Sequence, residues 1–129
     1  MKAISVKQPW ANMIACGAKT IETRTWGTSY RGQLLIVSSK TPKIEPAGFA
    51  VAVADVVDCR LMTKEDEAAA CCSIYPDAHA WILSNVRRIE PIPIKGALGI
   101  YEVSVDPASL TNIDRSDAAA CTPRQRQLF

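Results

Sequence analysis

Residues 5–24, which read SVKQPWANMIACGAKTIETR, decide how the rest of this chain is interpreted. Pro9 suits the first turn of a helix, because the N–H that proline lacks has no partner there. The apolar side chains that follow recur with the helical period and form one stripe, made of Trp10, Met13 and Ile14. Gly17 can take the positive φ that ends a helix. We therefore expect a strand over residues 3–6, a short helix from Pro9 and a second strand over residues 20–25.

Polar side chains stand on both sides of this expected helix. Lys7 and Gln8 precede it, and Lys19, Glu22 and Arg24 follow it. In an extended segment Glu22 and Arg24 share one face, roughly 6–7 Å apart along the strand. Lys19 belongs to the turn that leads into the strand. We expect these side chains to converge on one concave surface, with the helix as its wall.

Lys19, Glu22 and Arg24 have two interpretations. As an exposed ion-pair network at the entrance of a strand, they would add little stability. As part of a binding cleft, Lys19 and Arg24 would hold a phosphate or a base edge, since arginine suits planar, bidentate recognition. Glu22 would then accept a hydrogen bond from an exocyclic amine, or orient Lys19.

The charges are distributed unevenly along the chain. The net charge is +2, but residues 1–43 carry seven lysine and arginine side chains against Glu22 alone. This segment therefore has a net charge of +6, which leaves −4 for residues 44–129. We weigh chance clustering of solvated lysines against a basic surface that attracts phosphates, and the second interpretation is favoured.

The bulk properties exclude several classes of protein. A length of 129 residues predicts one domain with its own core. No apolar run approaches the roughly 18–20 residues of a membrane span, and the first residues lack the apolar core and cleavage site of a signal peptide. The chain has one histidine and no Cys-x-x-Cys spacing, so we predict no zinc site. We expect a cytoplasmic domain without a metal or cofactor.

The later part of the chain is predicted to be rich in strands. Phe49, Val51 and Val53 alternate with alanines, which predicts a strand that turns these three side chains to the core. Pro91 and Pro93 would interrupt strand pairing, which favours a sheet edge or a bend there. Strands are expected over residues 33–37, 49–57, 79–89 and 98–105, a loop over residues 41–48 and a helical turn at residues 106–107.

A second helix is expected over residues 63–72. Thr63 suits its N-cap, and acidic side chains are favoured in a first helical turn by the helix dipole. The charged run over residues 64–67, KEDE, is therefore interpreted as the solvated start of a helix rather than as a metal site.

Five motifs in this chain resemble those of the ASCH domains (activating-signal-cointegrator homology), a family of the PUA-like superfamily. In the family's order they are QPWA at residues 8–11, G-x-K-x-x-E-x-R at 17–24, RGQLLIVSSK at 31–40, WILSNVRRI at 81–89 and PIPIKGALGIYEV at 91–103. The resemblance covers about residues 2–105. It implies an α+β fold, a PUA-like mixed or antiparallel β-barrel with two or three short flanking helices. We assign residues 1–110 to the domain and expect residues 111–129 to form a loosely ordered tail.

The tryptophans and the later lysines complete the candidate site. Trp10 lies on the apolar stripe of the helix and is expected to pack in the core beside the cleft. Trp26 would either stack on a base or cover one end of the barrel, and Trp81 is expected in the core. Lys95 occupies a position where the family pattern also has a basic residue. The predicted ligand-binding residues are Lys7, Gln8, Trp10, Lys19, Glu22, Arg24, Lys40 and Lys95.

The resemblance implies RNA or a modified nucleoside as the ligand, since ASCH domains are regarded as RNA-binding or RNA-linked modules. The alternative is a hydrolase. One branch of the family resembles nucleoside amidohydrolases with an activated threonine near the G-x-K lysine. In this chain Lys19 matches that lysine, but Glu22 stands at the position of the nucleophile and has no hydroxyl group. A ribonuclease or an N4-acetylcytidine-type amidohydrolase would therefore use Lys19 and Glu22 as its catalytic residues. A third alternative is an adaptor that binds a protein partner.

Overall fold

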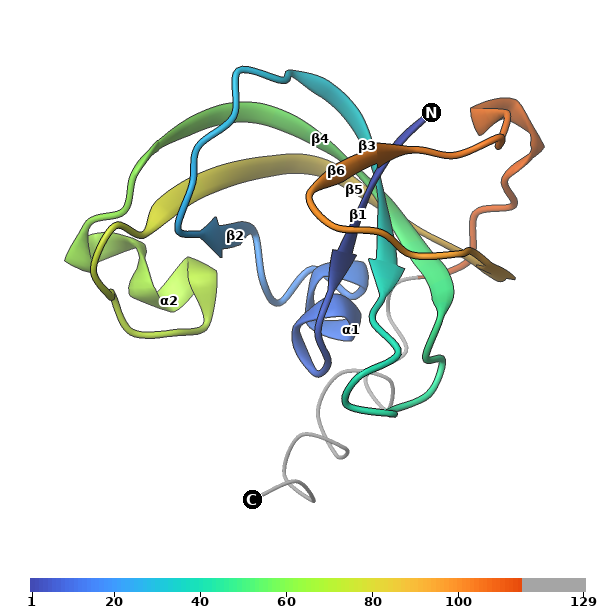
Figure 1. Cartoon of the computed structure of the whole chain (residues 1–129), viewed down its shortest axis with the longest axis horizontal. Coiled ribbons are helices and arrows are strands. Elements are labelled where there is room, and N and C mark those ends of the chain that lie inside the picture. Colours follow the sequence, from blue (N-terminus) through green and yellow to red (C-terminus); the bar gives the residue numbers. More distant parts are fainter. Residues whose placement is uncertain (115–129) are drawn as a thin grey trace.

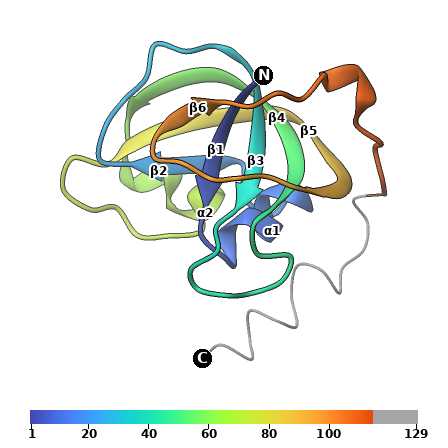
Figure 2. The ribbon, with the colours of Figure 1, turned by 45° about the vertical axis from the view of Figure 1, so that its right-hand side comes forward.

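The computed structural model describes residues 1–114, which are built around one strongly curled, six-stranded sheet (Figure 1). In the order β2-β5-β4-β3-β1-β6, β1 is parallel to β3 and the other neighbouring strands are antiparallel. Figure 2 shows β1 between β3 and β6 at one edge of this sheet. The mixed α+β prediction is confirmed. The strands are β1 (Lys2–Val6), β2 (Ile21–Arg24), β3 (Gly32–Ser38), β4 (Phe49–Leu61), β5 (His79–Pro93) and β6 (Ile100–Glu102).

The helices are short, and α1 packs inside the curl of the sheet. Helix α1 (Trp10–Ala15) follows Pro9, and Gly17 has a φ of +87°, as the sequence predicted. The single helix expected over residues 63–72 is instead a 3₁₀ turn, η1 (Lys64–Asp66), followed by α2 (Glu67–Ala70). A second 3₁₀ turn, η2 (Pro107–Ser109), follows the expected Asp106–Pro107 start.

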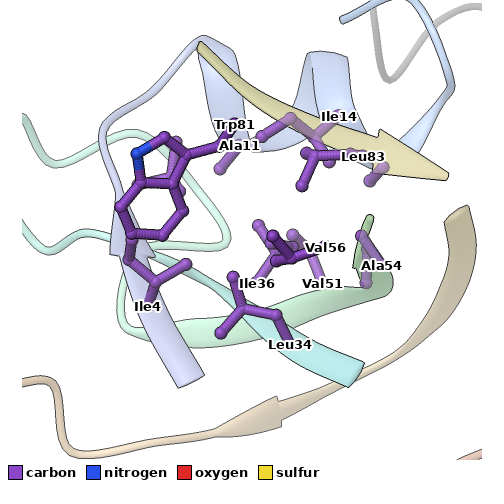
Figure 3. Packing of buried hydrophobic residues seen from close by; sticks show 13 residues of the cluster. Ile4, Ala11, Ile14, Leu34, Ile36, Val51, Ala54, Val56, Trp81 and Leu83 are labelled. Atoms are coloured by element: carbon purple, nitrogen blue, oxygen red, sulfur yellow. The ribbon is translucent and has the colours of Figure 1, made fainter. Parts of the chain in front are cut away.

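The main core lies between α1 and the strands, around the fully buried Trp81 (Figure 3). Helix α1 contributes Ala11 and Ile14 to it. Trp26 packs edge-on against Trp81, with 4.9 Å between the ring centroids, and its carbonyl accepts a 3.2 Å hydrogen bond from Trp81 Nε1. Trp81 therefore lies in the core as predicted, and Trp26 covers this core from outside.

Strand β4 departs from the predicted alternation. Val51 and Val53 were expected to share one face with alanines opposite, and this is wrong. Val51 lies with Ala52 in the core under α1, whereas Val53 lies with Ala50 in a second cluster on the other face of the sheet. The pairing of β4 with β5 shifts register between Ala50 and Ala52. Such a bulge inserts an extra residue and reverses the side-chain alternation beyond it.

Strand β5 continues through both prolines, beyond its expected end at residue 89. Strand β2 pairs with β5 only over residues 79–82, so beyond residue 82 the neighbouring strand of β5 is β4 alone. Proline is tolerated in such an edge segment. The other side of β5 accepts residues from the expected tail. Ile113 N–H donates to the Arg88 carbonyl at 2.8 Å, and Glu90 N–H donates to the Thr111 carbonyl at 2.8 Å. Residues 111 and 113, which were assigned to the tail, thus hydrogen-bond to β5, and residues 115–129 lie outside the described residues.

Candidate functional site

A cleft of about 810 Å³ opens beside the ends of β1 and β3. Its walls come from β1 with the start of α1, from β2, from the loop after β3, from residues 72–75 and from the loop over residues 94–99. Seven of the eight side chains that the sequence nominated line it, and they are Lys7, Trp10, Lys19, Glu22, Arg24, Lys40 and Lys95. The fold thus brings together the polar residues on both sides of α1 with two lysines that are distant in the sequence.

The floor of the cleft is a network of charges around the Glu22 carboxylate. Its Oε2 accepts from Arg24 Nε at 3.0 Å and lies 2.9 Å from Arg24 Nη2, and its Oε1 lies 3.6 Å from Lys19 Nζ. Arg24 Nη2 also donates to the Ser5 carbonyl at 2.7 Å. The shared face of Glu22 and Arg24 is thus confirmed, and Arg24 ties the edge strand β2 to the end of β1.

Lys19 is buried beneath this floor rather than exposed on it. Its side chain is 2% exposed, and Nζ donates to the Ala70 carbonyl at the end of α2. The last carbonyl groups of a helix have no partner within the helix and favour a cation. Lys19 therefore fastens α2 to the floor of the cleft and holds Glu22 in place.

Trp10 serves the core and the cleft together. Its ring is half-buried and packs against the main core cluster, as the apolar stripe predicted, while it also lines the cleft. Its Nε1 donates to the Cys71 carbonyl at 3.4 Å. The segment that ends α2 is therefore held from the cleft side by two residues, Trp10 and Lys19.

Gln8, the eighth nominated residue, does not reach the cleft. It is 2% exposed, its Nε2 donates to Ser38 Oγ at 2.9 Å, and its Oε1 accepts from the Asn12 N–H at 3.0 Å. A buried amide needs partners for its donors and acceptors, and here it finds them at the start of α1 and the end of β3. Gln8 is therefore a structural link between these elements.

The rim of the cleft carries three exposed lysines, Lys7, Lys40 and Lys95. Within residues 1–114, no carboxylate forms an ion pair with any of them. The stem of Lys40 lies over Gly48, where an added Cβ would meet Lys40 Cε at 3.1 Å and the φ of +80° already disfavours other residues. The rim is thus a row of ammonium groups that are free to meet an anion.

Several lining residues were missed by the sequence analysis. Cys72 and Tyr75 come from the loop after α2, and no local pattern connects that loop to residues 5–24. Thr23 also lines the cleft, with its Oγ1 at 3.8 Å from Cys72 Sγ, although strand alternation pointed it away from Glu22 and Arg24.

The charged run over residues 64–67 is not simply solvated. Asp66 is 7% exposed, and its carboxylate accepts hydrogen bonds from Nη1 and Nη2 of Arg60, at 2.7 and 2.9 Å. Its Oδ2 also accepts from the Thr63 N–H at 2.8 Å. The hydrogen bonds from Arg60, followed by that from the Thr63 backbone, hold the pKa of Asp66 well below its usual range. The Arg60–Asp66 pair thus fixes the start of the η1–α2 segment. At the other end of this segment, the Ala70 carbonyl accepts the hydrogen bond from Lys19.

Two features, a metal-ligand cluster and a membrane-spanning helix, are absent from residues 1–114. The described residues contain no group of three His, Cys, Asp or Glu side chains that is arranged to hold a metal ion. No helix in residues 1–114 is long and apolar enough to cross a membrane.

The family model described as "ASCH domain" matches residues 4–93, so the chain belongs to the ASCH domain family. Activating signal cointegrator 1 from Homo sapiens and its counterpart from Mus musculus are each 25% identical to it over 126 residues. Each alignment covers 78% of this chain and 22% of the relative. The chain thus spans about a fifth of the length of these curated relatives.

Solved structures support the same fold. The crystal structure of ASCH from Zymomonas mobilis superposes with a TM-score of 0.64 at 16% identity, covering 79% of this chain and 86% of that one. A variant of the Zymomonas mobilis protein gives a TM-score of 0.60 at 13% identity, covering 79% and 88%. The strongly curled sheet with its short helices is therefore a PUA-like fold of the ASCH type. Membership of this family links the chain to RNA binding in general terms.

Proposed function

We propose that this ASCH domain binds RNA, or a modified nucleoside, in the cleft beside α1. The observation that carries the proposal is that three exposed lysines, Lys7, Lys40 and Lys95, line the same cleft as Glu22 and Arg24 and have no carboxylate partner within residues 1–114. Unpaired ammonium groups attract phosphates through counterion release, and the affinity that they supply falls as salt rises. The excess of positive charge in residues 1–43 supports the same ligand class.

The size and walls of the cleft suit a nucleoside. A volume of about 810 Å³ falls in the range of small-molecule sites, which is roughly 300–1,000 Å³. Trp10 and Tyr75 are half-buried aromatic residues on its walls. Aromatic side chains in such positions stack on unpaired bases of RNA.

The test is the affinity for a fluorescent single-stranded RNA oligonucleotide across a salt series. We expect wild-type binding that is measurable at about 50 mM salt and weakens steadily above it. A Lys40→Ala/Lys95→Ala variant should bind at least tenfold more weakly at low salt. Lys43→Ala is the matched control, because Lys43 is an exposed lysine that does not line the cleft. Absence of binding of both the RNA and free nucleosides by the wild type at low salt would refute the proposal and favour a protein-interaction adaptor.

The alternative is a ribonuclease or an amidohydrolase with Lys19 and Glu22 as the catalytic pair. In the cleft, Lys19 Nζ is occupied by the Ala70 carbonyl and Glu22 is held by Arg24, so both groups serve the floor. This arrangement supports binding more than proton transfer. We expect acetylated cytidine and RNA to stay intact after long incubation with the domain. Turnover that Glu22→Gln abolishes would establish the alternative.

A further inference from the structure

The distribution of charge within the cleft bears on how a nucleotide would lie in it, and this inference rests on the proposed function. The geometry points to one orientation, in which the floor takes the uncharged edge of an unpaired base and the phosphates lie on the lysine rim. The floor side chains Glu22 and Arg24 are 10% and 24% exposed, and Lys19 beneath them is 2% exposed. A ligand on the floor therefore meets Arg24 and the edge of Glu22, and not Lys19.

Arg24 and Glu22 each keep one polar atom without a short hydrogen bond inside the described part of the chain. Arg24 uses Nε and Nη2 on Glu22 and the Ser5 carbonyl, while Nη1 bonds to no acceptor within the described part of the chain. Glu22 Oε2 is held by Arg24, but Oε1 meets Lys19 only at 3.6 Å and so keeps acceptor capacity. The Watson–Crick edge of a base offers an N–H donor next to an acceptor atom. The floor therefore holds both a donor and an acceptor, the two kinds of group that such an edge needs.

A phosphate group fits this floor poorly. Its oxygen atoms are acceptors, so it has nothing to donate to Glu22, and its negative charge would be repelled by that carboxylate. Lys19 and Arg24 still attract an anion by their charge, but Lys19 is 2% exposed and Arg24 Nε and Nη2 already donate to internal acceptors, so few donors remain for a phosphate oxygen.

The rim has the opposite character. Lys7, Lys40 and Lys95 are exposed, and within residues 1–114 none of them has a carboxylate partner. The loop that carries Lys95 is held close to the cleft, since a Cβ at Gly96 would lie 3.1 Å from Ser5 Oγ. Phosphates on either side of an inserted base would therefore meet ammonium groups to which no carboxylate of residues 1–114 is bound.

This orientation sets the class of ligand. A base whose Watson–Crick edge faces Glu22 and Arg24 cannot be paired at the same time, so the cleft selects single-stranded RNA over a duplex. The base supplies contacts that do not depend on salt, and the phosphates supply contacts that do.

The first experiment uses the wild-type protein and competition against a labelled single-stranded oligonucleotide. Cytidine and adenosine at millimolar concentration should displace the label, and ribose 5-phosphate and inorganic phosphate at the same concentration and ionic strength should not. A duplex of the same sequence should bind at least tenfold more weakly. Displacement by ribose 5-phosphate without displacement by nucleosides would overturn the orientation while leaving RNA binding, and so the proposed function, intact.

The second experiment measures whether removal of the negative charge of Glu22 weakens or strengthens ligand binding. If a base edge meets Glu22, Glu22→Gln should weaken nucleoside and RNA binding by about tenfold, because a hydrogen bond to a charged acceptor is lost. If a phosphate lay there, the same substitution would strengthen RNA binding by removing a repulsion. In Lys40→Ala/Lys95→Ala, nucleoside affinity should stay within twofold, and the slope of log K against log salt should become shallower by about 1.4, or about 0.7 for each contact. Thermal unfolding of each variant, with Lys43→Ala as control, checks that the fold is retained.

Discussion

Lys19 and Glu22 hold each other beneath the cleft, with Lys19 Nζ 3.6 Å from Glu22 Oε1 and the two side chains 2% and 10% exposed. The pair joins three elements. Lys19 also bonds to the carbonyl that ends α2, and Glu22 bonds to Arg24, which reaches the Ser5 carbonyl in β1. The residues that shape the floor thus also hold the edge strand β2 and the α2 wall in position.

Replacement of Lys19 should therefore destabilise the domain. Lys19→Met keeps the length of the side chain but leaves Glu22 with one cationic partner and the Ala70 carbonyl with none. Breaking a buried ion pair from one side costs about 3 kcal/mol of unfolding free energy. Urea denaturation measures the change, and Lys43→Met, on an exposed lysine, should stay within about 0.5 kcal/mol of wild type. A Lys19→Met protein as stable as that control would show that the pair contributes nothing to the fold.

The Arg60–Asp66 pair should make stability sensitive to acid. The pKa of Asp66 is lowered in the folded state, first by Arg60 and then by the Thr63 N–H. A carboxyl with a depressed folded pKa stabilises the fold above its unfolded pKa of about 3.9, and this stabilisation is lost as pH falls below that value. Asp66→Asn should thus be less stable than wild type at pH 7, and the difference should shrink below about pH 4. Urea midpoints from pH 7 to pH 2 test this, and a difference that does not change with pH would contradict it.

Trp26 should contribute to stability and not to ligand binding. It packs edge-on against Trp81 and does not line the cleft. Trp26→Ala should lower the unfolding free energy by about 1–2 kcal/mol, from lost burial and a lost aromatic pair. RNA affinity of the folded variant should stay within twofold of wild type. A large loss of affinity without a loss of stability would instead support base stacking by Trp26.

Gln8 should behave as a structural residue too. Gln8→Met keeps a similar volume but leaves Ser38 Oγ and the Asn12 N–H without their partner. Leaving buried polar groups unsatisfied costs about 1–3 kcal/mol. The expected result is a lower unfolding free energy with nucleoside affinity unchanged once the protein is folded. A variant with wild-type stability and weakened nucleoside binding would return Gln8 to the list of ligand contacts.

Much of the site was accessible from short-range patterns. The helical stripe after Pro9 located α1, and the two-residue spacing of Glu22 and Arg24 placed them on one face. Both inferences concern residues a few positions apart, where backbone geometry alone decides proximity. The alternation of β4 was mispredicted because a bulge depends on how the partner strand pairs, and single-strand periodicity does not contain that information.

The sequence by itself determined the family, the short helix, the elements around it and the cluster of charged residues near residues 5–24. Only the tertiary structure decided which of these side chains a ligand can reach. It buried Lys19 and Gln8, left Lys7, Lys40 and Lys95 exposed on the rim, and brought Cys72 and Tyr75 to the wall. The physical reason is that exposure and partner choice depend on segments some fifty residues apart in the chain, such as the carbonyl of Ala70 that captures Lys19.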